Sequence, residues 1–175
     1  LNFNVLLSQR GILRLAHSHH ELESQRRWAN SIQIIGIDSE VMNPQQIKKL
    51  VPSINLQGRL PVHGGFIQKR GGIARHDAVV WAYARAASNL GVDIIQETEV
   101  TDFKITEGRI TGVKTSQGQV SADRVCISVA GHTSVLARKA GFRLPITSMA
   151  LQAMVSEPIK PCLNTVVMSN MIHVY

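Results

Sequence analysis

The residues with the clearest capacity for chemistry lie just before a predicted helix, in the run Gly71-Gly72-Ile73-Ala74-Arg75-His76-Asp77. A helix N-terminus carries unpaired N–H groups and a positive pole, so it favours anions and disfavours a protonated imidazole. Arg75 acts on His76 in the same direction. A neutral imidazole is a nucleophile, and its attack on an electrophilic cofactor carbon would give a covalent link. His76 is thus a candidate site residue, although such a histidine more often only begins a helix beside a cap such as Asp77.

The residues around His76 are suited to a phosphorylated planar ligand. Lys69, Arg70 and Arg75 are candidates for pairing with a phosphate. Gly71 and Gly72 have no Cβ, so a planar group would be able to approach their backbone closely.

A second candidate site is Ala130-Gly131, which follows the apolar run Arg124–Val129 and precedes a short predicted helix. A strand, a turn of small residues and a helix start often receive a dinucleotide pyrophosphate or adenosine. The sequence contains no G-x-G-x-x-G motif, so the pattern by itself is more typical of a plain connection.

The sequence gives little support for a metal site or a hydrolase active site. His17, His19 and His20 lack the i, i+4 spacing of ligands on one helix face, and no cysteine is near them. A solvated helix start is the favoured interpretation of this cluster. No Ser-His-Asp or metalloprotease pattern is present, and we predict no metal ligand.

The composition is that of a globular protein, with 44% hydrophobic and 18% charged residues among 175 and a net charge of +7. Dispersed basic residues and only 5% aromatics argue against nucleic-acid binding. No apolar run approaches the length of a membrane span.

Cys126 and Cys162 lie among apolar neighbours, so we expect reduced, buried thiols in the cytoplasm. Neither end of the sequence resembles a natural terminus, and we expect an internal part of a longer polypeptide.

The first half of the sequence predicts strands followed by two helices. Asn4–Ala16 alternates as two strands joined near Gly11. Ser18 and Glu21 form a capping box for a helix that ends at Gly36. Asn43 caps a second helix that must end before Pro52. The buried face of the first helix is expected to hold Leu22, Trp28, Ala29 and Ile32.

The second half predicts a helix and a β-meander. Asp77–Leu90 has helical spacing in Val79, Tyr83, Ala86 and Leu90, and a strip of small residues at Ala78, Ala82 and Ala86. A two-turn helix follows Gly131 and ends at Gly141. The expected strands are Val92–Gln96, Val100–Thr106, Arg109–Thr115, Gln119–Val120, Arg124–Val129 and parts of Ile146–Tyr175. The fold class is therefore mixed α/β with a large antiparallel component.

These segments together resemble the β subunits of heterotetrameric sarcosine oxidases, collinearly over essentially the whole chain. The matching stretches include Ser8-Gln9-Arg10-Gly11, Ala74-Arg75-His76-Asp77, Trp81-Ala82-Tyr83-Ala84-Arg85, Gly91-Val92-Asp93-Ile94-Ile95-Gln96, Glu99-Val100-Thr101, Gly112-Val113-Lys114-Thr115, Ala130-Gly131-His132, Leu144-Pro145-Ile146 and Thr165-Val166-Val167-Met168-Ser169-Asn170.

The resemblance implies an FAD-dependent oxidoreductase of the glycine oxidase/D-amino acid oxidase fold. An FAD-binding Rossmann-like domain would be interleaved with a substrate domain that holds a mixed, largely antiparallel sheet. Residues 1–72 and 143–175 would belong to the substrate domain and 73–142 to the FAD domain. The family's N-terminal glycine-rich motif and C-terminal segment are absent here, so no catalytic acid or base is assigned.

The same resemblance assigns site residues. His76 falls at the covalent FMN attachment site, linked through its imidazole to the flavin 8α-methyl. The phosphate that Lys69, Arg70 or Arg75 would pair with is then that of FMN. Val100 falls where the family contacts the adenosine region of FAD. Ala130 and Gly131 border the same cofactor.

The implied reaction oxidises sarcosine to an imine at FAD and passes electrons to FMN and then to oxygen. The products are glycine, H2O2 and a one-carbon unit, as formaldehyde or methylene-tetrahydrofolate. An α subunit with NAD and tetrahydrofolate and smaller γ and δ subunits complete the family's assembly. Two alternatives remain: an FAD-dependent amine dehydrogenase similar to dimethylglycine dehydrogenase, with His76 unmodified, and a non-catalytic basic subunit that binds a partner.

Overall fold

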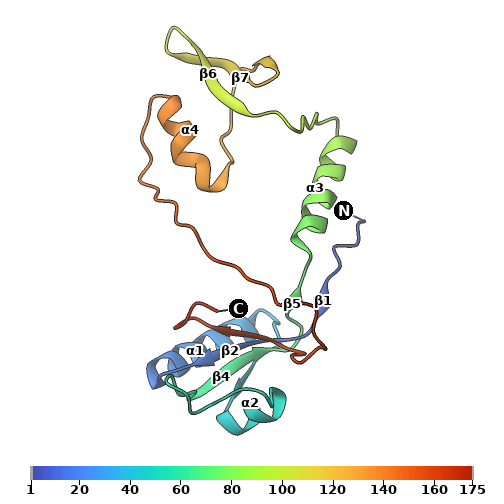
Figure 1. Cartoon of the computed structure of the whole chain (residues 1–175), viewed down its shortest axis with the longest axis vertical. Helices are drawn as coiled ribbons and strands as arrows, with labels where there is room; N and C mark the ends of the chain where they lie inside the picture. The colour runs from blue at the N-terminus through green and yellow to red at the C-terminus, as the bar shows by residue number, and fades with distance from the viewer. Residues whose placement is uncertain (1, 175) are drawn as a thin grey trace. The chain divides into compact units, whose positions relative to one another are not determined.

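The chain forms two compact units in a computed structural model that describes residues 2–174. The first unit takes in the chain up to Val92 and again from Pro158 onward, and the second spans Asp93–Glu157 (Figure 1). These divisions differ from the boundaries expected at 72/73 and 142/143. The assignment of those ranges to substrate and FAD domains stays a prediction.

The first unit is built on a four-stranded mixed sheet of order β3-β4-β2-β9. The inner strand β2 pairs antiparallel with β4 and parallel with β9, while β3 pairs antiparallel with the other edge of β4. The elements of this unit are β1 (Ser8–Gln9), β2 (Ile12–Ala16), α1 (His19–Ile34), β3 (Glu40–Met42), α2 (Pro44–Leu50), β4 (Gly64–Gln68), β5 (Gly72–Ile73), α3 (His76–Asn89) and β9 (Val166–Ser169).

The core of this unit lies where β2 and β4 meet α2. Leu13 and Ile47 are fully buried there. Phe66, 2% exposed, lies on the other face of the sheet, where its ring contacts Trp28 of α1. Alternate residues of β2 point to opposite faces, which is why Leu13 and Leu15 enter the core together. Val51, Val62 and Ile67 complete the apolar cluster.

Helix α1 begins at Ser18 as predicted, because the Ser18 hydroxyl accepts a hydrogen bond from the Glu21 N–H. The reciprocal half of the box is shifted, since the Glu21 carboxylate accepts from the His17 N–H at 2.6 Å. Figure 1 shows α1 beside β2 and β4. Its buried residues are Ala29 and Gln25, and Gln25 donates to the Leu15 carbonyl.

The expected burial of Trp28 was wrong, since this side chain is 40% exposed. Its ring lies 5.0 Å from that of Phe66 and carries the Arg14 guanidinium 4.4 Å from its centroid. One face of the Trp28 ring contacts the half-buried Arg14 cation, so the side chain is partly buried instead of fully buried.

Helix α2 confirms its predicted start. The Asn43 side chain accepts from the Gln46 N–H, and the Gln46 side chain accepts from the Asn43 N–H, which forms a complete capping box. The helix ends at Leu50 with Val51 as C-cap, ahead of Pro52.

The two strands expected in Asn4–Ala16 form, but they do not pair with each other. β1 pairs antiparallel with β5, and β2 enters the four-stranded sheet. Gly11, between them, adopts φ +76°, a conformation that glycine tolerates and that redirects the chain from one sheet to the other.

The second unit contains a three-stranded antiparallel meander of order β6-β7-β8 and one short helix. Glu107 and Gly108 both have positive φ, as a two-residue turn compatible with strand twist requires. Gly141 ends the helix with φ +88°, as predicted. The elements are β6 (Val100–Thr106), β7 (Arg109–Thr115), β8 (Gly118–Ser121), a 3₁₀ turn η1 (Ala130–His132) and α4 (Thr133–Lys139).

Several predicted strands do not form among the described residues. Val92–Gln96 and Arg124–Val129 have no strand partner, and only Val166–Ser169 forms a strand after residue 146. Ile94 and Ile95 are exposed. A strand is stable only when a neighbour satisfies its N–H and C=O groups, so an apolar run without such a neighbour stays irregular.

The burial of α3 and of the cysteines also differs from expectation. The alanine strip faces inward through Ala78 and Ala82, whereas Tyr83 and Leu90 of the predicted stripe are 64% and 86% exposed. Cys126 and Cys162 are free but exposed, because each lies in a segment without strand pairing. No helix within residues 2–174 combines the length and hydropathy that crossing a membrane requires.

Gly72→Ala is expected to destabilise the first unit. An added Cβ would lie 2.1 Å from the Ser8 carbonyl oxygen, so β1 and β5 would have to separate. Overpacking of this kind costs about 1–3 kcal/mol or more. The free energy of unfolding in urea measures it. Gly58→Ala is the matched control, because its Cβ would meet only ordinary contacts, and equal losses in both variants would contradict the proposed cause.

Candidate functional site

His76 lies at the first position of α3, and two residues, Ala74 and Arg75, separate it from β5. Arg75 is the N-cap residue and makes no side-chain cap hydrogen bond. The Arg75 N–H donates to the Val5 carbonyl at 3.2 Å, which fixes the start of the helix against the segment before β1. The His76 side chain is exposed, and no hydrogen bond within residues 2–174 engages its ring. A reagent in solvent can therefore reach the imidazole.

Asp77 is not an N-cap but a first-turn residue that holds the helix start through its carboxylate. It accepts from Arg75 Nη2 at 2.6 Å and Nε at 3.1 Å, and from the Ala78 N–H at 2.8 Å. The Arg75 hydrogen bond, with the Ala78 N–H second, lowers the pKa of Asp77 below its ordinary 3.8. The same contact raises the pKa of Arg75.

All three cations predicted to bind the FMN phosphate have carboxylate partners. Lys69 lies 2.7 Å from Glu40, which raises the pKa of this lysine. Arg70 lies 3.7 Å from Asp38 and donates to the Gly36 carbonyl. A phosphate would have to displace these carboxylates, which exposed ion pairs permit because they contribute little to stability. The phosphate role of Lys69, Arg70 and Arg75 stays a prediction.

Gly71 and Gly72 are explained by the packing of the chain itself. A Cβ on Gly71 would lie 2.8 Å from the Ile12 side chain, and one on Gly72 would meet the Ser8 carbonyl. The segment that holds both glycines therefore packs closely against Ile12 of β2 and Ser8 of β1, and this packing explains the lack of side chains without a ligand.

The residues predicted to contact FAD lie in the second unit. Val100 begins β6, opposite Thr115, and is half-buried. Ala130 adopts φ +45°, an uncommon and costly conformation for alanine. The Ala130 carbonyl accepts from Thr133 Oγ1, and the Gly131 carbonyl accepts from Ser148 Oγ, each at 2.7 Å. These bonds hold the turn in place at the entrance of α4.

Lys139 connects the two predicted FAD-contacting segments. Its Nζ donates to the Thr101 carbonyl at 2.6 Å, which ties the last turn of α4 to β6 beside Val100. A contact between residues 38 positions apart has no local sequence signal.

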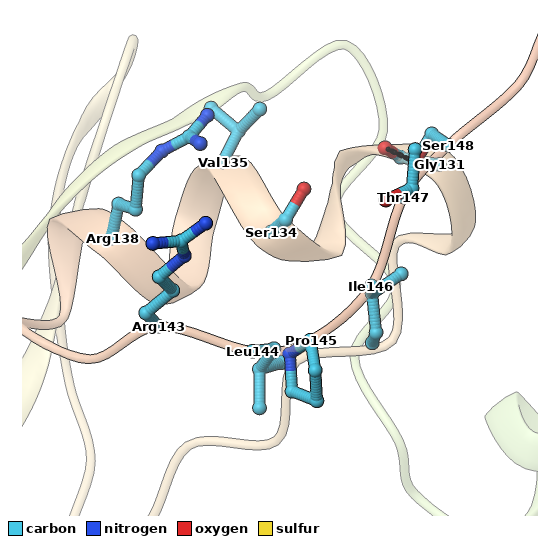
Figure 2. A pocket seen from close by; sticks show the side chains of 10 residues that line it. All are labelled: Gly131, Ser134, Val135, Arg138, Arg143, Leu144, Pro145, Ile146, Thr147 and Ser148. Atoms are coloured by element: carbon cyan, nitrogen blue, oxygen red, sulfur yellow. Dashed lines mark hydrogen bonds between the residues drawn. The ribbon is translucent and has the colours of Figure 1, made fainter.

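A cleft of about 660 Å³ begins at Gly131 and runs along α4 (Figure 2). Sequence reasoning missed it, because its far wall comes from the irregular segment after α4. Its lining consists of Gly131, Ser134, Val135, Arg138, Arg143, Leu144, Pro145, Ile146, Thr147 and Ser148.

The histidine cluster does not converge on a point. His17 Nε2 lies 2.8 Å from Ser169 Oγ, and its Nδ1 faces the carbonyls of Leu60 and Pro61. His19 packs instead against the ring of His63. Among residues 2–174 no group of three or more His, Cys, Asp or Glu side chains has the arrangement of a metal site.

This fold and the pattern of the FAD dependent oxidoreductase family, which matches residues 1–174, define the class: the chain belongs to that family. It is 52% identical over its full length to the sarcosine oxidase subunit beta of Rhodobacter capsulatus, covering 42% of that protein. It is 49% identical, again over its full length, to the subunit of the same name from Arthrobacter sp, covering 44%. The chain thus spans less than half the length of these relatives.

A solved structure supports the fold. The L-proline dehydrogenase of P. horikoshii aligns with 97% of this chain and 45% of its own, with a TM-score of 0.72 and 22% sequence identity. At this identity the likeness shows the fold alone. The expected fold class, a mixed α/β member of the FAD-dependent oxidoreductases, is confirmed.

Arg75 and Asp77 predict a pH dependence at the start of α3. A carboxylate whose pKa is lowered in the folded state stabilises that state above its ordinary pKa, and the contribution is lost as pH falls through the lower folded value. We expect Asp77→Asn to remove this part of the acid dependence of stability, measured as the free energy of unfolding from about pH 5 to about pH 2.

Arg75→Gln should act in the same direction, because it removes the largest cause of the lowered Asp77 pKa. Asp123→Asn, at an exposed position in the other unit, is the control. If neither Asp77→Asn nor Arg75→Gln changed the fall in the free energy of unfolding at acid pH, the pair would not hold the helix start.

Proposed function

We propose that this chain is part of a sarcosine oxidase β subunit that oxidises sarcosine at FAD. Sarcosine would lose two electrons and two protons to give an imine, which water splits to glycine and formaldehyde. The electrons would pass to FMN and then, with two protons, to oxygen as H2O2. The observation that carries the proposal is the 49–52% identity across the full chain to two proteins named sarcosine oxidase subunit beta.

His76 is proposed as the covalent attachment residue for FMN. A bound flavin supplies the electron-accepting chemistry, and the chain supplies the nucleophile and its placement. Two observations fit this role: the imidazole is exposed, and no hydrogen bond within the described chain occupies its nitrogens. Asp77 holds Arg75 beside it, so the neighbouring charge is fixed while the ring stays accessible.

Val100, Ala130 and Gly131 are proposed to contact FAD. The support for this contact is the turn at Ala130, whose backbone is left-handed. The Thr133 hydroxyl donates to the Ala130 carbonyl and the Ser148 hydroxyl to the Gly131 carbonyl, which holds the turn. Gly131 lines the cleft, and the nearest side chain to its Cα face is that of Ser148. A planar or ribityl group can approach a glycine there without meeting a Cβ.

The assembly and location are proposed from the family resemblance. An α subunit would carry NAD and tetrahydrofolate, γ and δ subunits would complete a heterotetramer, and the complex would be cytoplasmic. The name subunit beta of the two relatives supports a multi-subunit enzyme. With tetrahydrofolate on the α subunit, the one-carbon product would leave as methylene-tetrahydrofolate.

His76→Asn tests the proposal directly. Acid precipitation of the purified complex should leave part of the flavin covalently bound to the unaltered protein. The same treatment should release all flavin from the variant, which should still bind FAD non-covalently before precipitation. His20→Asn, an exposed histidine at the start of α1, is the control and should retain the bound flavin. Covalent flavin persisting in His76→Asn would exclude His76 as the attachment residue.

The substrate is tested separately by product analysis. The complex is expected to convert sarcosine to glycine and H2O2 with oxygen as the acceptor. Turnover of dimethylglycine with an artificial acceptor, no reaction with oxygen and no covalent flavin would instead favour the related dehydrogenase. A protein without flavin that turns over neither amine would favour the non-catalytic subunit.

A further inference from the structure

The cleft along α4 is electropositive and lacks a counter-charge. Its lining includes the guanidinium groups of Arg138 and Arg143, the hydroxyls of Ser134, Thr147 and Ser148, and no carboxylate. Figure 2 shows both arginines at one end of the cleft and Gly131 and Ser148 at the other, and Ser134 lies midway between these two ends.

Neither guanidinium has an ion-pair partner within residues 2–174, unlike Lys69 and Arg75, which lie within ion-pair distance of a carboxylate. Most cations of the described chain are likewise unpaired, so the two arginines stand out by lining one concave surface together. Two positive charges that line one concave surface repel each other unless an anion lies between them. A cleft of one sign also concentrates ligands of the opposite sign.

The chemistry of the lining selects among anions. Two guanidinium forks and a hydroxyl offer more donors than the two oxygens of a single carboxylate accept. A phosphate monoester presents three oxygens and close to two negative charges, which suits charge-assisted bonds from both arginines. The apolar part of the lining comes from Val135 on α4 and from Leu144, Pro145 and Ile146 on the segment after it.

From these features we propose that the cleft binds a small organic phosphate ester. Its phosphate lies between Arg138 and Arg143 within reach of Ser134, and its apolar part packs on Leu144 and Pro145. The arginines occupy the end of the cleft away from Gly131, and we assign this ligand a position separate from the flavins on that basis. The inference goes beyond the proposed function and does not depend on it.

Binding of phenyl phosphate to the flavin-loaded, full-length protein tests the proposal by titration calorimetry. Benzoate carries the same ring with a carboxylate and should bind more weakly. Arg138→Gln/Arg143→Gln should weaken phenyl phosphate binding by about tenfold or more, because two charge-assisted contacts are lost. Arg109→Gln/Arg124→Gln removes two exposed positive charges of the same unit outside the cleft and should change the affinity by less than about twofold.

Three results would overturn the proposal. The first is equal affinity in the cleft variant and the unaltered protein. The second is an equal loss in the Arg109/Arg124 control, which would indicate only the general charge of the surface. The third is phenyl phosphate binding seen in flavin-free protein but absent once FAD is loaded, which would assign the cleft to the cofactor.

Chemical protection provides a second measurement that needs no substituted protein. Phenylglyoxal modifies accessible arginines, and peptide mapping reports the sites. Phenyl phosphate should protect Arg138 and Arg143 in the unaltered, flavin-loaded protein and leave Arg109 unprotected. Unchanged modification of Arg138 and Arg143 at saturating phenyl phosphate would contradict the site even if the double variant failed to fold.

Discussion

The placement of His76 depends on one close backbone contact between β1 and β5. The Gly71 carbonyl accepts from the N–H groups of both Arg10 and Gly11, and Gly72 lies where a Cβ would meet Ser8. The Arg75 N–H then donates to Val5, so the segment before α3 is tied to the N-terminal segment at two successive points. Gly11 leads directly into β2, an inner strand of the mixed sheet that carries Leu13. The hydrogen bonds from Arg10 and Gly11 to Gly71 therefore anchor the start of α3 to the core around Leu13.

Local sequence signals predicted the elements whose stability is local. Three such signals act over two to four residues: the Asn43 cap of α2, the Ser18 cap of α1, and the tight turn between the strands predicted at Val100–Thr106 and Arg109–Thr115. Each feature forms where the pattern indicated. The apolar runs at Val92–Gln96 and Arg124–Val129 failed for the opposite reason. Their strand propensity requires a neighbour that the described chain does not provide, and the same lack leaves Ile94 and Cys126 exposed.

The candidate site was predictable in its residues but not in its contacts. A helix start with His76 and Arg75 was visible in the sequence, whereas the bidentate pairing of Arg75 with Asp77 depends on side-chain geometry. The glycines beside it illustrate the same limit. Their lack of a side chain suggested room for a ligand, but Gly72 serves the approach of Ser8. The Lys139–Thr101 contact and the two arginines of the cleft depend on tertiary structure and carry no signal in the local pattern.

The central claim is that the exposed imidazole of His76 is the anchor of a flavin, and peptide mapping of the unaltered protein tests it most directly. The complex is purified with its partner subunits, digested and separated, with flavin fluorescence and mass recorded for each peptide. The account predicts one fluorescent peptide, which contains His76 and carries the added mass of FMN. An unmodified His76 peptide from active enzyme, with the covalent flavin found on another residue or on none, would contradict it.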